Sequence, residues 1–359
     1  MKKREDQEVT VQEEIDAPFA TAPHVVLLGA GASRAALPNG DRYGRAVPLL
    51  REVAAQLDLI VRFLEDLRKL AASDFEAAYS RLYDRDAGQT SGIADALREY
   101  FAELELPLEP TIYDALLLSL RGKDAVVTFN WDPFLLQAHD RLRAVGIYQG
   151  VLPTIWFLHG NVAVGYCPQH EQVRAAPGAK CRHCGEIVLP SRLLFPVEHK
   201  DYKDGSMIER EWTMVQGYLR RAFMLTVFGY SAPATDVEAK ELLRDAWGNV
   251  EDRNMEQIEI IDRPGADHDT LRELWSPFIH THHYEIHDSF YDSWIAKHPR
   301  RTREAHIDQY RNARFIDDHP VPSESATLID LVAWFEPLFD AEHRFMDAVA
   351  TDGEDDQSS

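Results

Sequence analysis

The chain has few cysteines, no long apolar run and no apolar leader. Only three of its 359 residues are cysteine, which excludes a framework in which every cysteine forms a disulfide. No apolar run reaches the roughly 20 residues that a membrane-spanning helix needs. The start of the chain, Met-Lys-Lys-Arg, lacks the apolar segment of a signal peptide. We therefore expect a cytoplasmic protein with no membrane contact.

Positive charge is also scarce. Lys and Arg number 38 against 60 Asp and Glu, so the formal net charge is -22. This charge disfavours direct binding to nucleic acid, because phosphates are repelled. It does not exclude a small anionic ligand, since backbone N–H groups in a turn act locally. With 45% hydrophobic residues, the chain can bury the core of one large domain with an insert, or of two domains.

Three short polar motifs each follow a strand-like apolar run. The motifs are Gly29–Ser33 (GAGAS), Thr128–Asp132 (TFNWD) and His159-Gly160. In an open parallel sheet, ligands bind at the carboxyl ends of the strands. The pattern therefore predicts an α/β, Rossmann-like doubly wound parallel sheet whose glycine turn approaches a phosphate.

Each motif taken alone also has an ordinary interpretation. A Gly-Ala-Gly turn is common without a nucleotide, and Arg34 stands where a dinucleotide motif has its third glycine. Asn130 and Asp132 can cap a turn, and His159 can be an ordinary buried histidine. The order of the motifs and their placement at strand ends favour a ligand site.

All three cysteines lie close together, with a histidine among them. Cys167-x-x-His170 is followed, after ten residues, by Cys181-x-x-Cys184, a spacing that suits a Cys3His zinc site. Four protein ligands would leave no open position, so such a zinc ion would be structural. Two alternatives stay open: a site without metal, and His183 as the fourth ligand.

In their order these motifs resemble those of the sirtuin family. Sirtuins carry a GAG-x-S turn, a T-x-N-x-D segment, a His-Gly pair and then a zinc module. Val227–Ser231 and Ile258–Asp262 are similar to the family's later strand-and-turn segments. The resemblance covers about residues 22–265.

The resemblance implies that NAD is the substrate. His159 would be the general base, Asn130 would hold the ribose and the attacking group, and Asp132 would orient the ribose or the carboxamide. The remaining expected contacts to NAD come from the turns after the strands: Gly29, Ala30, Gly31, Ser33, Thr128, Gly229, Ser231 and Asp262.

Two departures from deacylating sirtuins favour hydrolysis of NAD. Gly40-Asp41 stands where those enzymes have a Phe-Arg pair, and Leu194–Glu198 replaces a Phe-Gly-Glu segment that pairs with the peptide. Pro196 in that segment has no N–H for a continuous ladder. The chain thus looks closer to sirtuin-like NAD hydrolases of bacterial antiviral defence. The alternatives are an NAD-dependent protein-lysine deacylase and a non-catalytic module that binds NAD or ADP-ribose.

The same analysis predicts the organisation of the chain. We expect a disordered acidic arm over 1–20 and an NAD-binding domain over 21–265, with a helical insert at about 45–121 and a zinc module at about 163–196. A C-terminal α/mixed extension over 266–350 and a disordered acidic tail over 351–359 follow. The resemblance implies a homo-oligomer, or assembly with an ATPase, a nuclease or an Argonaute-like protein.

Overall fold

The structure is a computed structural model. It describes residues 8–47, 49, 52, 55–148, 150–170, 174–195, 207–232, 236–249, 251, 253, 256–280, 282–323 and 327–355.

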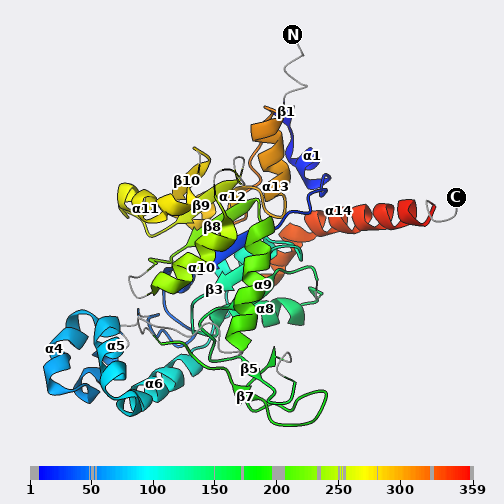
Figure 1. The fold of residues 1–359 in the computed structure, drawn as a ribbon. Helices are drawn as coiled ribbons and strands as arrows, with labels where there is room; N and C mark the ends of the chain where they lie inside the picture. Colours follow the sequence, from blue (N-terminus) through cyan, green and yellow to red (C-terminus); the bar gives the residue numbers. More distant parts are fainter. Residues whose placement is uncertain are drawn as a thin grey trace.

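The centre of the molecule is a six-stranded sheet in the order β10-β9-β8-β2-β3-β4 (Figure 1). Its strands, in chain order, are β2 (His24–Leu28), β3 (Ala125–Thr128), β4 (Thr154–Phe157), β8 (Met224–Phe228), β9 (Gln257–Ile261) and β10 (Tyr284–His287). Every pairing between them is parallel. The predicted α/β, Rossmann-like fold is confirmed.

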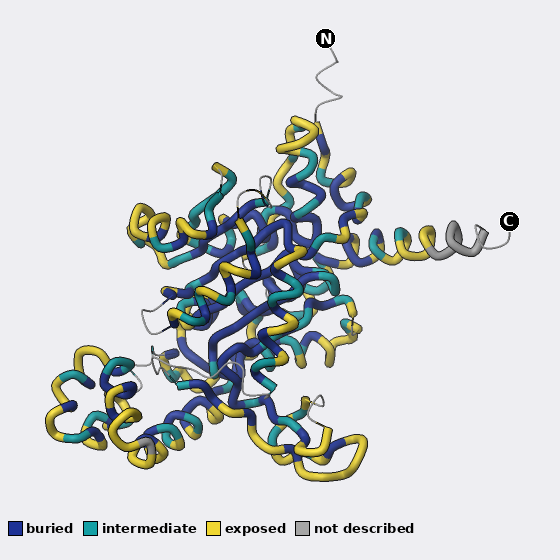
Figure 2. Tube along the Cα trace, in the orientation of Figure 1, coloured by how far each residue is buried: buried dark blue, intermediate teal, exposed yellow. Residues whose placement is uncertain are grey.

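Helices cover both faces of this sheet, which explains why its strands read as continuous apolar runs. On one face, Val26 and Leu28 belong to a core shared with α2 (Ala30–Ala36), α7 (Ile112–Leu118) and α8 (Phe134–Ala144). On the other, Val25 and Leu27 pack with α9 (Met207–Arg221), α10 (Val237–Trp247) and α11 (His268–Trp275). Figure 2 shows the buried strands at the centre.

The strand order reverses at β2. From β2 the chain continues to β3 and β4 on one side, and then returns to β8 on the other side of β2. In doubly wound folds, the crevice at the carboxyl ends of the two strands beside such a reversal is where ligands bind. Here those two strands are β2 and β8, which precede Gly29 and Gly229.

Within the segment predicted as a helical insert, residues 59–102 form a lobe beside the sheet (Figure 1), whereas α7 packs on the sheet itself. The lobe comprises η2 (Leu59–Arg62), α4 (Glu65–Ser73), α5 (Phe75–Arg85) and α6 (Ala87–Ala102). Its core contains buried apolar side chains such as Phe63, Phe75 and Leu97. The lobe therefore buries its own apolar stripe.

The N-terminal segment differs from the predicted loose arm. β1 (Glu8–Val9) pairs with β11 (Phe315–Ile316), and α1 (Val11–Ile15) begins at a capping box formed by Thr10 and Glu13. Glu14 is buried and faces His298, with 3.0 Å between the Oε1 and Nδ1 atoms. Residues 8–20 are thus held by a distant part of the chain, which no local pattern indicates.

The C-terminal extension comprises short elements and one long helix. The elements are η4 (Ser276–Phe278), η5 (Phe290–Asp292), α12 (Trp294–Lys297), α13 (Thr302–His306), η6 (Ile307–Arg311) and α14 (Leu328–Asp355). The first half of α14 packs on the core, and its second half projects away from the body (Figures 1 and 2). The helix runs into the segment predicted as a disordered tail. Among the described residues no helix has the length and apolarity to cross a membrane.

Polar residues inside the strands find their partners in this extension. Glu259 accepts hydrogen bonds from the Thr226 hydroxyl (2.8 Å) and from the backbone N–H of Trp294 (2.5 Å). His24 contacts Thr226 and Thr302 through its two ring nitrogens, and burial lowers its pKa to about 3. A buried polar group must be paired, so these strands require the extension.

Candidate active site

The glycine turn after β2 fits closely against the turn after β8. The Gly29 N–H donates to the Phe228 carbonyl (3.0 Å), and the Gly31 N–H donates to the Gly229 carbonyl (2.9 Å). A Cβ atom at Gly29 would lie 2.5 Å from the Gly229 oxygen, and Gly229 itself has a φ of +61°. Neither position accepts a side chain, so the backbones meet directly at the strand-order reversal.

The Ser33 hydroxyl lies at the centre of a buried polar cluster. It donates to Asp132 Oδ2 (2.7 Å) and accepts from Asn130 Nδ2 (3.0 Å). The Tyr113 hydroxyl lies 2.6 Å away and supplies the remaining hydrogen. One donated and two accepted bonds use the full capacity of a hydroxyl. Ser33 therefore orients its neighbours, and the predicted contact of Ser33 with NAD stays a prediction.

The turn after β3 is held from both sides. Asn130 Nδ2 also donates to the Gly29 carbonyl (2.9 Å), and the Thr128 hydroxyl accepts from the Asn130 N–H (3.0 Å). Asn161, just after the His-Gly motif, donates to the Asp132 carbonyl (2.7 Å). The three predicted strand ends are thus joined by direct hydrogen bonds. Sequence analysis missed Asn161 and Tyr113.

Burial raises the pKa of Asp132 to about 6, although hydrogen bonds from Ser33 and the Phe134 N–H oppose the rise. Burial and the nearby Asp132 carboxylate also raise the pKa of Tyr113 well above its ordinary value. A carboxyl group that titrates near neutral pH at a strand end is typical of functional sites. The phenol stays protonated and serves as a donor.

His159 follows β4 and is almost fully buried. Its ring meets the Phe129 ring edge-on, with 4.6 Å between centroids, and Phe129 stacks on Tyr230 at 4.4 Å. His159 Nε2 lies 4.0 Å from Oδ1 of Asp236, the first residue of the turn into α10. Asp236 belongs to none of the motifs, so sequence analysis missed it.

The other predicted NAD contacts also lie at this edge of the sheet. Ala30 and Ser231 are exposed, directly after β2 and β8. Asp262 is half-buried after β9, where its Oδ1 accepts the Arg263 N–H (2.7 Å). The structure thus places a row of accessible polar positions beside the glycine turn.

The four predicted metal ligands come together in a small module. The module contains β5 (Gly165–Tyr166), β6 (Arg174–Ala175) and β7 (Leu189–Pro190). The ligand atoms of Cys167, His170, Cys181 and Cys184 all lie within 4.8 Å of one another. Zn–S bonds of about 2.3 Å place tetrahedral ligands roughly 3.7 Å apart, and the Cys167 Sγ atom is 3.5 Å from Cys184 Sγ and 3.8 Å from His170 Nδ1.

The chemistry of this cluster suits structural zinc. Backbone N–H groups of His183 and Cys184 lower the pKa of the Cys181 thiol to about 6, which favours the thiolate that binds metal. The His183 ring stays outside the cluster and contacts Arg182 (3.2 Å). The structure brings together the ligand set that includes His170, and not the alternative set with His183.

Side chains from this module and from α9 hold the edge strand β4. Arg174 donates to the Ile155 carbonyl and to Glu211 Oε1, each at 3.1 Å, and Glu211 accepts the Phe157 N–H. Burial raises the pKa of Glu211 to about 7, against the lowering effect of Arg174. The strand that ends at His159 is therefore connected to the cysteine cluster through Arg174.

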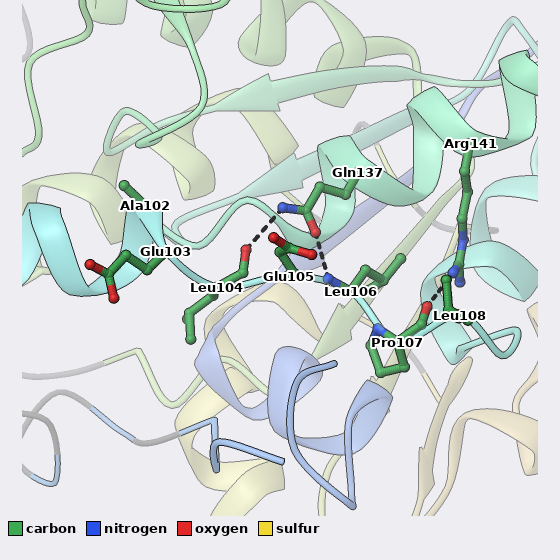
Figure 3. A pocket seen from close by; sticks show the side chains of 9 residues that line it. All are labelled: Ala102, Glu103, Leu104, Glu105, Leu106, Pro107, Leu108, Gln137 and Arg141. Carbon is green, nitrogen blue, oxygen red and sulfur yellow. Dashed lines mark hydrogen bonds between the residues drawn. The ribbon is translucent and has the colours of Figure 1, made fainter. Parts of the chain in front are cut away.

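A cavity of about 570 Å³ lies apart from this site (Figure 3). It is lined by residues 102–108, Gln137 and Arg141. Gln137 bonds to Leu104 and Leu106, and Arg141 pairs with Asp114. Because these groups satisfy one another, the cavity offers little to a ligand, and we place the candidate site at the sheet edge.

Comparison with known proteins finds similarity in structure only. No family model matches the chain, and no curated protein matches its sequence. A Sir2 homologue in complex with ADP-ribose aligns with 82% of this chain and 96% of its own, at 17% identity and a TM-score of 0.36. A Sir2 enzyme solved for its mechanism and regulation aligns with 87% of this chain and 100% of its own, at 15% identity and a TM-score of 0.38. Sir2 bound to an acetylated peptide aligns with 85% of this chain and 99% of its own, at 16% identity and a TM-score of 0.34.

Proposed function

We propose that this protein hydrolyses NAD⁺ to nicotinamide and ADP-ribose. The observation that carries the proposal is the convergence of Asn130, Asp132 and His159 beside the Gly29–Gly31 turn, at the reversal of the strand order. Such a crevice is where doubly wound folds bind dinucleotides. The resemblance of these motifs to those of sirtuins supports the choice of NAD.

The chemistry fits the residues present. The bond between nicotinamide and ribose breaks with its electron pair moving to the ring nitrogen, and positive charge develops on the ribose. Water forms the new bond to the ribose carbon and releases one proton. His159 would accept that proton, and an oriented base contributes about 10²- to 10⁴-fold in rate. Asn130 and Asp132 would orient the ribose and the attacking water.

Contacts after the zinc module support water as the acceptor. Phe195 stacks on Tyr79 of the helical lobe, with ring centroids 5.2 Å apart, and lies 4.7 Å from Trp131. The Leu194 N–H donates to the His159 carbonyl (3.0 Å). In deacylases the matching segment receives the acyl-lysine peptide, whereas here Phe195 of this segment contacts the chain's own lobe. Pro196–Glu198 lie outside the described residues.

The test is NAD⁺ consumption by the purified chain, with products separated by chromatography. We expect nicotinamide and ADP-ribose in equal amounts without any peptide. His159→Ala should lower the rate about 10²- to 10⁴-fold, because it removes the base. His268→Ala is the matched control, since that histidine is exposed and pairs with Asp288 at 3.0 Å.

Other outcomes would identify the alternatives. Turnover only with an acetyl-lysine peptide, giving O-acetyl-ADP-ribose, would replace hydrolysis by deacylation. Binding of NAD⁺ without turnover would indicate a binding module. An unchanged rate in His159→Ala would contradict the proposed base.

The resemblance to antiviral sirtuin-like proteins supports a role in defence, in which loss of cellular NAD stops growth. An ATPase, a nuclease, an Argonaute-like protein or a second copy of the chain would then control the activity. Expression of the wild-type chain with and without its genetic neighbours, beside His159→Ala, tests this role. Cellular NAD that never falls under any of these conditions would contradict it.

A further inference from the structure

We propose that Asp236 is a positioning residue that holds the His159 imidazole and stabilises it once it is protonated. This inference rests on the proposed function, since it assigns a partner to the proposed base. It is carried by the geometry of four side chains: Phe129, His159, Tyr230 and Asp236.

The position of Asp236 in its helix is the first observation. Asp236 is the N-cap of α10, where an aspartate ordinarily accepts a hydrogen bond from the first turn of its helix. It makes no such capping bond in the described structure of α10. Its Oδ2 accepts the Tyr230 hydroxyl (2.9 Å) instead, and its Oδ1 faces His159 Nε2 at 4.0 Å. The carboxylate is thus directed into the site and away from its helix.

The second observation is that these side chains form a closed ring. Phe129 packs against His159 and stacks on Tyr230, Tyr230 bonds to Asp236, and Asp236 faces His159. They come from the ends of β3, β4 and β8 and from the start of α10. All four are buried, so rotation of any one ring disturbs its neighbours. The arrangement fixes the orientation of the imidazole before a ligand binds.

The negative charge of Asp236 gives this closed set of four side chains a chemical role. A carboxylate at about 4 Å favours the protonated form of an imidazole, and low exposure strengthens the attraction. The imidazole contacts the Asp236 carboxylate from α10 and the Phe129 ring after β3, whereas the Leu194 N–H donates to the backbone carbonyl of His159. The Tyr230 phenol donates its hydrogen bond to the Asp236 carboxylate. The 4.0 Å separation is longer than a hydrogen bond, and such contacts commonly shorten when substrate binds.

The experiment is the pH profile of kcat/KM for NAD⁺ hydrolysis by the full chain and its variants. Asp236→Asn keeps the shape and removes the charge, so we expect a fall of about tenfold and an acid limb that moves about one pH unit lower. Asp236→Ser can cap α10 without supplying charge and should behave like Asp236→Asn. Asp236→Glu should restore part of the rate, and Tyr230→Phe should give a smaller change in the same direction.

Asp74→Asn is the matched control. Asp74 is an N-cap that does bond to its own helix, accepting the Ala77 N–H at 3.0 Å, so its pH profile should equal that of the wild type. Thermal unfolding of each variant separates loss of fold from loss of rate. The ring signal of His159, assigned by its loss in His159→Ala and titrated by NMR, gives a readout without turnover. In Asp236→Asn its midpoint should fall.

Each other outcome overturns a defined statement. An unchanged pH profile and NMR midpoint in Asp236→Asn would overturn the role of Asp236. Faster turnover by Asp236→Asn would overturn it too, because the carboxylate would then obstruct His159. Full activity of His159→Ala, or no turnover by the wild type, would contradict the proposed function, while the NMR midpoint would still decide the pairing.

Discussion

Two buried polar clusters in this molecule hold the carboxylates of Asp132 and Glu342 in opposite ways. In the site cluster (Ser33, Asn130, Asp132 and Tyr113), burial raises the pKa of Asp132 to about 6. In the second, which we call the terminal joint (Arg121, Arg300, Arg301, Glu304 and Glu342), the arginines lower the pKa of Glu342 to about 2 against the effect of burial. The two carboxylates are buried to a similar extent, so the difference between their pKa values comes from the groups that contact them.

The terminal joint pairs its charges. Glu342 lies 2.6 Å from Arg300 and 2.7 Å from Arg301, and Glu304 lies 3.1 Å from Arg121. Arg301 also donates to the Ile15 carbonyl (2.8 Å). The joint therefore fastens the N-terminal segment and the C-terminal extension to the body of the protein.

The site cluster leaves its carboxylate with neutral donors. Ser33 and the Phe134 N–H bond to Asp132, and no described contact brings a cation to it. An anion held this way costs stability and stays responsive to ligand and pH. The comparison teaches that pairing with arginines sets Glu342 apart from Asp132. Glu304 of the joint is intermediate, because its Oε2 atom has no hydrogen-bond partner in the described structure and burial raises its pKa.

The cysteine cluster extends the comparison, because a zinc ion bound there would bring its positive charge from outside the chain. We expect zinc removal to have the largest effect: the module around residues 163–195 should lose its structure, since structural zinc supplies folding energy. Arg174 would then release the Ile155 carbonyl, and β4 would loosen next to His159. Hydrogen exchange of both segments, read by mass spectrometry, measures this.

Cys181→Ser should reproduce the effect of the chelator, and added zinc should reverse the chelation. His183→Ala is the matched control, because His183 neighbours the cluster without joining it. Equal exchange with and without chelator would show that the module needs no metal.

Glu342→Gln should have the next largest effect. It leaves the buried Arg300 and Arg301 without their anion, and breaking such a pair costs about 3–5 kcal/mol. Because the pKa of Glu342 is lowered, its contribution is present above pH 4.5 and is lost as the pH falls toward about 2. In Glu342→Gln, the part of the acid-induced loss of stability that comes from Glu342 should therefore be absent. Chemical denaturation over pH 2–7 is the measurement.

Glu52→Gln provides the control for this pair. Glu52 faces Arg34 at 3.4 Å on an exposed surface, where a pair is worth about 0–1 kcal/mol. If the two variants lost similar stability, the joint would have no special role.

Asp132→Asn should have the smallest effect on stability and the opposite sign. Because the pKa is raised from 3.8 to about 6, the folded chain binds a proton more tightly than the unfolded chain, so stability falls as the pH rises through this window. In the neutral variant this loss of stability should be absent, a gain of about 3 kcal/mol at pH 8. Its NAD⁺ turnover should fall.

The matched control for this prediction is Asp262→Asn, at the same sheet edge but half-exposed, and its unfolding free energy should change little. A destabilised Asp132→Asn would mean that the carboxylate is structural, which would remove the contrast between the two clusters.

The sequence predicted what lies within single strand–turn segments. The placement of Gly29, Asn130 and His159 at strand ends was predictable because each follows an apolar run within one or two residues, and the sheet brings such ends together. The cysteine spacing likewise predicted a four-residue cluster. These signals are local, so one chain suffices to find them.

The missed residues come from segments with no motif of their own. Tyr113 reaches Ser33 from α7, and Asp236 reaches His159 from the turn before α10. Their roles depend on packing between elements distant in sequence, which periodicity does not encode. The ordered structure of residues 8–20 was missed for the same reason, because the Ile15 carbonyl accepts a hydrogen bond from Arg301, which is distant in sequence.

The way β4 is held also restricts how this protein can aggregate. An exposed edge strand is a template on which strands of other molecules can stack without limit. At β4 the Ile155 carbonyl and the Phe157 N–H already bond to Arg174 and Glu211, so an incoming strand would have to displace a guanidinium and a carboxyl group. Arg174 and Glu211 therefore protect this edge of the sheet against the addition of further strands.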